Sequence, residues 1–166
     1  LGLVKKLATG EGTVSVAVAD KHVFFRFENY QISSALIDGQ FPNYRKVIPD
    51  NQEHSFLVSK EELEEALKRV SLLVEKSRRI YVELSDGLMT LTSEESEIGR
   101  AREEIVCDYS GSETTIALNY LYLVEPLRVI ETDTIRFEFT DPGKAITLHS
   151  EPQANYFHIV MPMQIQ

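Results

Sequence analysis

Apolar and polar positions alternate along several stretches of the chain with the two-residue period of β-strands. These stretches form three pairs, and the short segment inside each pair contains Asp, Gly or Pro, which favour the reversal of an antiparallel hairpin. Val14, Val16 and Val18, for example, alternate with polar or small residues, which predicts a strand with one buried face. The predicted strand pairs are 13–19 with 22–27, 79–84 with 88–92, and 134–139 with 145–149.

A helical pattern precedes the second hairpin. Its apolar residues recur every three or four positions, and Ser59 and Glu62 have the spacing of a capping box at a helix start. The sequence therefore predicts an amphipathic helix with one buried stripe. The members of this stripe are Leu63, Ala66, Leu67, Val70, Leu73 and Val74.

Helical segments are also predicted before the other two hairpins. Apolar residues at 3–7 indicate the end of a short helix that stops at Gly10. The segment 120–130 is predicted to be helical with Asn119 as its N-cap. Pro126 lies inside this segment and removes one backbone hydrogen bond, so we expect a kink or a shortened helix.

The order helix, hairpin and further strands therefore recurs three times, which predicts an α+β fold. The last two copies together make one complete domain, 50–166, and the first copy, 1–49, makes the second half of a preceding domain with its linker. Pro49-Asp50-Asn51 is the predicted boundary. Because a half-domain with open strand edges is a poor independent fold and the chain begins with Leu1, we expect a fragment of a longer protein.

Composition and charge limit the classes of function. Hydrophobic residues make up 43% and charged residues 26% of the chain, which is typical of a folded soluble domain. The net charge of −9 argues against tight nucleic-acid binding, because phosphate neutralisation needs clustered Lys and Arg. Any contact with DNA is therefore expected to be local, transient or topological.

The number of cysteines and the lengths of the apolar stretches indicate in which cellular compartment the protein is expected. Cys107 is the only cysteine, which excludes an internal disulfide and a multi-cysteine zinc site and fits a reducing cytoplasm. Its neighbours are typical of a strand, so a buried, unreactive thiol is favoured over a nucleophile. The chain has no apolar stretch of about 18 residues, so we expect no membrane span.

No pattern of catalytic or metal-binding residues stands out. His22, His54, His149 and His158 form no close metal-binding pair, although His149 and His158 could meet across neighbouring strands. The acidic stretch 94–104 lacks the spacing of a calcium loop and is interpreted as a solvated or interface patch. We therefore predict a binding or structural protein with no catalytic residues, no metal and no cofactor.

Two segments are candidates for a binding role, although their residues taken alone favour core packing. Residues 37–49 read Ile-Asp-Gly-Gln-Phe-Pro-Asn-Tyr-Arg-Lys-Val-Ile-Pro, an aromatic stretch punctuated by prolines. Val160-Met161-Pro162-Met163 places two flexible methionines near the C-terminus, which would suit varied partner peptides, with core filling as the interpretation that the residues alone favour. These two motifs, together with the repeat order, resemble the bacterial DNA polymerase III β subunit, the sliding-clamp family, over the whole chain.

The resemblance implies the DNA-clamp fold: repeated helix-plus-hairpin units, with the sheets outside and the helices lining the pore of a ring. It implies a homodimer in the full-length form, a processivity factor without chemistry of its own that encircles duplex DNA without sequence specificity. The implied partners are the DNA polymerase III alpha subunit, the clamp loader, and other polymerases and repair proteins, all docked through short peptide motifs. The implied location is the cytoplasm, with no membrane partner.

The resemblance also implies three sets of functional residues. Those of the partner-peptide pocket are Pro42, Arg45, Lys46, Val47, Gly143, Ala145, Ile159, Met161, Pro162 and Met163. Those of the dimer interface are Leu72, Leu73, Glu103 and Glu104. The basic residues on the two helical segments expected to face DNA are Lys5, Lys6, Lys68, Arg69 and Lys76.

Two alternatives come from other classes. A small hydrolase built on helix-and-hairpin repeats predicts a polar catalytic cluster in a cleft. A purely structural assembly domain predicts no specific peptide pocket. The first is disfavoured by the lack of a catalytic pattern, and the second is separated from a clamp by a peptide-binding measurement.

Overall fold

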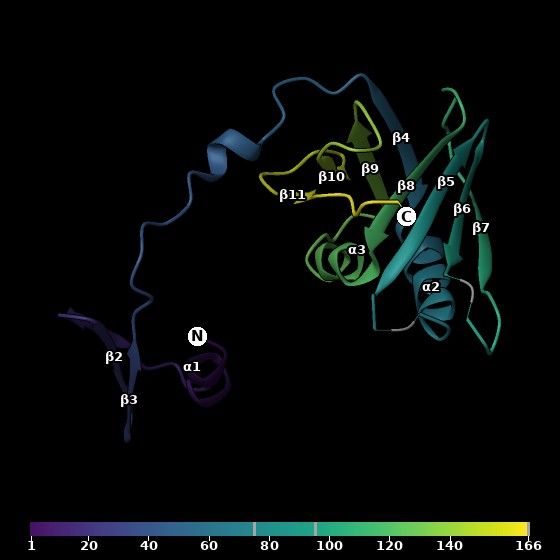
Figure 1. The fold of residues 1–166 in the computed structure, drawn as a ribbon. Helices are drawn as coiled ribbons and strands as arrows, with labels where there is room; N and C mark the ends of the chain where they lie inside the picture. Colours follow the sequence, from purple (N-terminus) through teal and green to yellow (C-terminus); the bar gives the residue numbers. More distant parts are fainter. Residues whose placement is uncertain (75, 95, 166) are drawn as a thin grey trace. The chain divides into compact units, whose positions relative to one another are not determined.

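The chain folds into two units, Leu1–Asn43 and Tyr44–Gln166 (Figure 1). The computed structural model describes residues 1–74, 76–94 and 96–165. Within these ranges, no helix has both the length and the apolar character needed to cross a bilayer.

The first unit contains one short helix and one small antiparallel sheet. Its strands pair in the order β1-β2-β3, and the register Ala19↔His22 confirms the first predicted hairpin. The helix ends at Leu7 and not at Gly10. The elements are α1 (Gly2–Leu7), β1 (Ser15–Ala19), β2 (His22–Phe27) and β3 (Tyr30–Ala35).

The first unit does not bury the apolar residues of its first strand. Val16 is 59% and Val18 66% exposed, and Val14 just before the strand is exposed as well, so the predicted buried face is wrong. Phe27 is the buried hydrophobic residue of residues 1–43. Three strands and a six-residue helix supply too few apolar neighbours to cover both faces of the sheet.

The second unit consists of a short 3-10 helix followed by two copies of one motif, a strand, a helix and three more strands. The 3-10 helix is η1 (Tyr44–Val47). The first copy comprises β4 (His54–Ser59), α2 (Lys60–Ser71), β5 (Arg79–Ser85), β6 (Leu88–Ser93) and β7 (Arg102–Val106). The second comprises β8 (Thr114–Asn119), α3 (Tyr120–Leu127), β9 (Thr134–Phe139), β10 (Ile146–Glu151) and β11 (Phe157–Val160).

The two copies exchange their first strands. One four-stranded sheet has the order β11-β10-β9-β4, and the other has the order β7-β6-β5-β8. β4 of the first copy thus pairs with β9 of the second, and β8 of the second pairs with β5 of the first, both antiparallel. This exchange joins the copies through backbone hydrogen bonds, so neither sheet is complete without the other copy.

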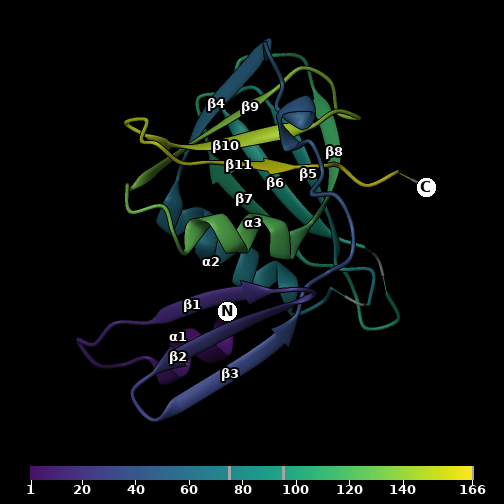
Figure 2. The ribbon, with the colours of Figure 1, turned by 90° about the vertical axis from the view of Figure 1, so that its left-hand side faces the viewer.

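The two helices lie side by side along one side of the strands (Figures 1 and 2). Ser59 caps α2 by accepting a hydrogen bond from the backbone N–H of Glu62 at 3.4 Å, and Asn119 caps α3 by accepting one from that of Leu121 at 3.1 Å. Both predicted N-caps are confirmed. Pro126 lies inside α3, which ends one residue later, in agreement with the predicted shortening.

The helices are in the same register relative to their N-caps, and this register determines the core. Leu63 and Leu67 follow Ser59 by four and eight residues, as Leu123 and Leu127 follow Asn119, and all four are at most 1% exposed. Aromatic rings extend the core between the sheets, with Phe56 stacked on Phe137 at a centroid distance of 5.0 Å. Each copy therefore contributes an equivalent apolar helix face to one shared core.

Two detailed predictions differ from the structure. Leu73, Val74 and Lys76 lie beyond α2, which ends at Ser71, so the helix is shorter than its apolar pattern. In β10 and β11 the register pairs Leu148 with His158 and His149 with Phe157. His149 and His158 therefore point to opposite faces of the sheet and do not meet.

Candidate partner-binding site

The C-terminal segment joins the edges of the two sheets of the second unit. β11 is the last strand of its sheet and pairs with β10, with Ile146 opposite Val160. Just beyond it, the backbone N–H of Met163 donates to the carbonyl of Ala117 in β8 at 2.7 Å, at the edge of the other sheet. Val160 is 1% exposed and anchors the segment in the core, whereas Met161 is 58% exposed. An anchored backbone thus presents a methionine side chain to solvent.

The turn between β9 and β10 lies beside this segment. Ala145 directly precedes Ile146, the partner of Val160, so the pairing register brings Ala145 next to Met161. The turn is held by Asp141, whose Oδ1 accepts from the N–H of Gly143 at 2.8 Å. A Cβ at Gly143 would lie 3.3 Å from that same oxygen, which makes a side chain there tight.

Within the second unit, the structure brings most of the predicted pocket residues to one edge. Ile159, Pro162 and Met163 are half-buried and follow one another along or beyond β11, next to the turn that carries Gly143 and Ala145. The basic members of the set are in a different element: Arg45, Lys46 and Val47 form η1 and are exposed. Pro42 belongs to the first unit.

Gln52 fastens the chain that follows η1 to the same hairpin, and the sequence analysis did not identify it. Its side-chain amide donates to the carbonyl of Glu138 at 2.7 Å and to that of Ala145 at 3.2 Å. Thr140 Oγ1 also donates to the carbonyl of Asn51 at 3.3 Å. A single glutamine beside a proline-rich stretch has no sequence signature, because its role depends on carbonyls far away in the chain.

Two further residues beside β11 were missed as well. Thr147 lies opposite Ile159, is 4% exposed, and its Oγ1 has no hydrogen-bond partner among the described atoms. Tyr122 on α3 is 49% exposed, and its backbone carbonyl is within hydrogen-bonding reach of His158. Burial lowers the pKa of His158, although Glu125 and this hydrogen bond act in the opposite direction.

The predicted interface residues lie near the free side of β7. Leu72, just after α2, is 79% exposed, whereas Leu73 is half-buried. Val106 in β7 and Ile98 in the preceding loop are each 75% exposed. Three large apolar side chains therefore lie open to solvent on or near this part of the second unit, two more than the sequence analysis singled out.

Most of the acidic residues in the stretch 94–104 are already paired within the chain. Glu94 lies 2.7 Å from Arg79, Glu103 lies 2.9 Å from Arg69, and Glu104 lies 2.8 Å from Arg102. Glu95 is outside the described residues. The hydrogen bond to Glu103 is the main cause of the raised pKa of Arg69.

The predicted DNA-facing cations differ in how available they are. Lys5 and Lys6 are exposed in the last turn of α1, and Lys68 is exposed in the last turn of α2. Arg69 is bound to both Glu65, at 3.4 Å, and Glu103. Lys76, beyond α2, is not on a helix.

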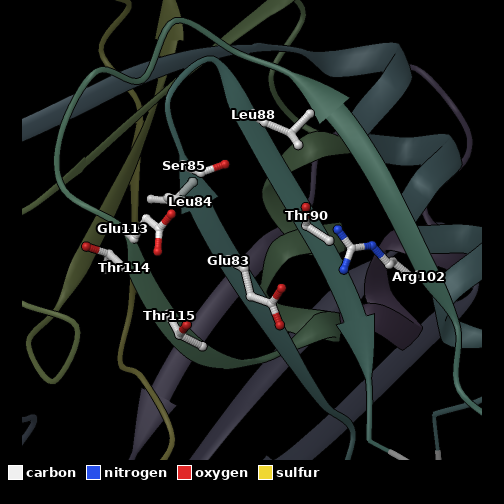
Figure 3. A pocket seen from close by; sticks show the side chains of 9 residues that line it. All are labelled: Glu83, Leu84, Ser85, Leu88, Thr90, Arg102, Glu113, Thr114 and Thr115. Carbon is white, nitrogen blue, oxygen red and sulfur yellow. The ribbon is translucent and has the colours of Figure 1, made fainter.

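A polar hollow of about 420 Å³ lies on the face of the β7-β6-β5-β8 sheet opposite α2 (Figure 3). Glu83 on β5 lies opposite Thr90 on β6, and Arg102 on β7 lies opposite Thr92, two residues farther along β6. Their charges are already paired, because Glu83 lies 3.6 Å from Arg100 and Arg102 lies 2.8 Å from Glu104. The rest of the lining consists of Glu113, the hydroxyl side chains of Ser85, Thr114 and Thr115, and the apolar Leu84 and Leu88.

The remaining residues with potentially reactive side chains are a cysteine and a histidine in the second unit. Cys107 is buried, as predicted, and burial is the main reason why its pKa is raised, which disfavours the reactive thiolate. His149 lies 3.3 Å from Glu138 at the surface of its sheet. Among the described residues, no group of three or more His, Cys, Asp or Glu side chains could hold a metal ion.

Solved structures of sliding clamps share this architecture. The chain superposes on the DNA polymerase III subunit β of Borrelia burgdorferi, solved in complex with a natural product, with a TM-score of 0.82 and 33% identity, covering 99% of this chain and 44% of that one. It superposes on the DNA polymerase sliding clamp of Pseudomonas aeruginosa with a TM-score of 0.81 and 29% identity, covering 98% and 45%. The fold is therefore the DNA-clamp fold.

Sequence comparison leads to one family. Residues 45–164 match the C-terminal domain and residues 1–43 the central domain of the DNA polymerase III beta subunit. The chain belongs to this family. It is 54% identical to the beta sliding clamp of Treponema pallidum over 171 aligned positions, covering 100% of this chain and 46% of that protein. The chain thus spans about half the length of the curated relatives it matches.

Proposed function

We propose that this chain is the C-terminal part of a sliding clamp, a non-catalytic processivity factor that encircles duplex DNA in the cytoplasm and tethers a replicative polymerase to it. The observation that carries the proposal is the family match over 45–164 and 1–43, together with TM-scores above 0.8 to clamp structures. The side-by-side helices on one side of the strands support it, because such helices can line a pore while the sheets form the outside.

Partner proteins dock, in this proposal, at the C-terminal edge of the second unit. Met161, Pro162 and Met163 supply adaptable apolar contacts, Gly143 and Ala145 form the neighbouring turn, and Arg45 and Lys46 orient the peptide by charge. The buried anchor Val160 and the bond from Met163 to Ala117 support this role, because they hold the backbone in place before any ligand arrives. The docked partners are the polymerase alpha subunit, the clamp loader and repair proteins.

The second unit also supplies one side of a subunit interface. Leu72 and Val106, with Ile98 nearby, offer apolar contacts, and β7 ends its sheet and can extend it by pairing with a strand of another subunit. Leu73 contributes less contact area, since it is half-buried. Glu104 and Glu103 add negative charge beside this edge, and Glu103 is already paired with Arg69.

The test is a titration of the isotope-labelled chain, followed by NMR, with a peptide that carries a glutamine followed by leucine and phenylalanine. Concentrations should reach about millimolar, where binding worth roughly −4 kcal/mol is detectable. We expect shifts at 143–147 and 159–163. A peptide with those three residues replaced by alanine is the matched control and should cause no shifts.

Two variants locate the binding site. Met161→Ala removes an exposed side chain whose backbone is held by Val160, so it should weaken peptide binding without loss of fold. Val106→Ser, at the β7 edge, should leave peptide binding unchanged. Equal weakening by both variants, or no shifts at the highest peptide concentration, would contradict docking at this edge and favour a purely structural assembly role.

A further inference from the structure

The hairpin of β9 and β10 ends in a turn that carries two of the residues proposed for the partner-peptide site, Gly143 and Ala145. The pairing register of the two strands reaches Glu138 opposite Thr147 and stops there. The bond between Gly143 and Asp141 shapes the turn from within and does not attach it to the rest of the unit. The chain that makes the turn therefore needs further contacts to keep a fixed position.

Gln52 supplies such contacts to both arms of the hairpin. Its Nε2 donates to the carbonyl of Glu138 in β9 at 2.7 Å and to the carbonyl of Ala145, which directly precedes β10, at 3.2 Å. A primary amide has two N–H groups, so this one nitrogen can satisfy both carbonyls. These two bonds, the Gln52 bridge, join the arms at the base of the turn.

The same bridge fixes the segment that follows η1. Asn51 and Gln52 lie between η1 and β4, and the carbonyl of Asn51 accepts a hydrogen bond from Thr140 Oγ1, at the end of β9, at 3.3 Å. Arg45 and Lys46 in η1 are exposed, and η1 buries none of its residues, so the hydrophobic core does not hold it. Three long-range hydrogen bonds therefore attach the chain after η1 to the hairpin.

We infer that Gln52 is a positioning residue of the partner-peptide site, an inference that rests on the proposed docking function. The Gln52 bridge holds Ala145 on one side and the chain that leads to Arg45 on the other side. Gln52 thus acts through the residues that it holds. A site whose parts are already in place loses less conformational entropy when a peptide binds, so the bridge raises the affinity.

The role depends on the amide nitrogen and not on the bulk of the side chain. Both hydrogen bonds start from Nε2, and Gln52 is half-buried, where water competes less for the two carbonyls. Methionine has nearly the same length and shape as glutamine but no N–H group. Gln52→Met therefore removes the bridge, keeps most of the packing and leaves the net charge of −9 unchanged.

The experiment is an NMR titration of the full 166-residue chain with the peptide that carries a glutamine followed by leucine and phenylalanine. A net hydrogen bond stabilises an arrangement by a factor of about 3 to 10, so the fraction of molecules in the binding arrangement should fall to about 10–30% without the bridge. Gln52→Met should therefore weaken the peptide affinity by about 3- to 10-fold. Gln153→Met, the matched change at an exposed glutamine between β10 and β11, should leave the affinity unchanged.

The free chain gives a test that does not need the peptide. Gln52→Met should shift or broaden the backbone amide signals of 45–47 and 140–146, which the bridge holds, and leave those of α2 at 60–71 unchanged. Changes of the same size in α2 would show that the substitution loosens the whole second unit. Gln52 would then have a structural role only.

Coupling to Arg45 separates positioning from a general structural role. Arg45→Gln should weaken the peptide affinity of the unmodified chain, because it removes an exposed cation of η1. In the Gln52→Met background the same change should weaken the affinity by a factor about 2-fold smaller, since Arg45 is no longer held in place. Equal factors in the two backgrounds would mean that Gln52 does not act through η1 and would overturn the positioning role.

The outcomes of the titration separate the positioning role from the docking function. If the unmodified chain does not bind the peptide, the docking function fails and the positioning role fails with it. If the unmodified chain binds and Gln52→Met binds as tightly, the positioning role alone is wrong. The same holds if Gln153→Met weakens binding as much as Gln52→Met.

Discussion

The chain contains the same order of elements, a helix followed by three antiparallel strands, in its first 43 residues and twice more after them. In the second unit the two copies bury a continuous core that includes Leu63, Leu67, Leu123 and Leu127. In the first unit Val16 and Val18 remain more than half exposed. The comparison teaches that local sequence is enough to form the helix and the hairpins, whereas a core needs a second copy.

Strand exchange explains the difference. In the second unit, β4 and β8 each pair with the three-stranded sheet of the other copy and add a fourth strand to it. The helices of both copies pack into the shared core. The sheet of the first unit has three strands. Since each helix-and-hairpin copy has one apolar face, two faces must meet before either is removed from water.

The largest expected effect comes from the core of the second unit. Leu67→Ala removes a fully buried side chain between the copies and should lower the free energy of unfolding by about 2–5 kcal/mol. Val16→Ala, the matched change at an exposed position, should lower it by less than about 0.5 kcal/mol. Denaturant unfolding followed by circular dichroism measures both. Similar losses for the two variants would show that the first unit buries Val16 in solution.

A smaller effect is expected at the helix N-caps. Ser59→Ala and Asn119→Ala each remove an oxygen that accepts a backbone N–H bond, and each should cost about 1 kcal/mol. Leu1, the N-cap of α1, makes no side-chain cap bond, so Leu1→Ala should change stability much less. The same unfolding measurement applies, and a cost at Leu1 as large as at Ser59 would contradict the contrast between the units.

The smallest effect is a pH dependence that comes from His158 in the second unit. Burial lowers the pKa of His158 in the folded state below the value of about 6.5 expected in the unfolded chain. The unfolded state therefore binds more protons as pH falls below about 6.5, and this contribution to stability, complete at higher pH, is lost toward lower pH. His158→Gln should flatten the profile of unfolding free energy against pH between about pH 6.5 and 5.

The local elements could be predicted because their signals lie close together in sequence. Ser59 and Asn119 were found as caps, Pro126 as the residue that shortens α3, and the hairpin turns by their Asp, Gly and Pro residues. The C-terminal motif Val160–Met163 identified one part of the candidate site. Each of these signals involves only a few neighbouring residues. The hydrogen bonds that form the cap or the turn join residues within one or two turns of each other.

Features formed by distant residues could not be predicted in this way. Gln52 binds carbonyls 86 and 93 residues away in the sequence, and His149 and His158 were misplaced because strand register decides which face each side chain occupies. In the sequence, Arg69 and Lys68 are equivalent candidates for contact with DNA. The structure separates them, because Arg69 is paired with Glu103.

The sequence alone determined the type and order of the elements, the helix caps, and the membership in a family through two separated motifs. Only the tertiary structure decided which strands exchange, which apolar faces find a partner, and which charges stay available. The physical reason is the distance along the sequence over which each effect acts. Helix propensity, capping and turn formation depend on a few neighbouring residues, whereas burial and ion pairing depend on which distant segments meet. Val16 and Leu67 are both apolar residues in regular elements, and only the second meets another copy.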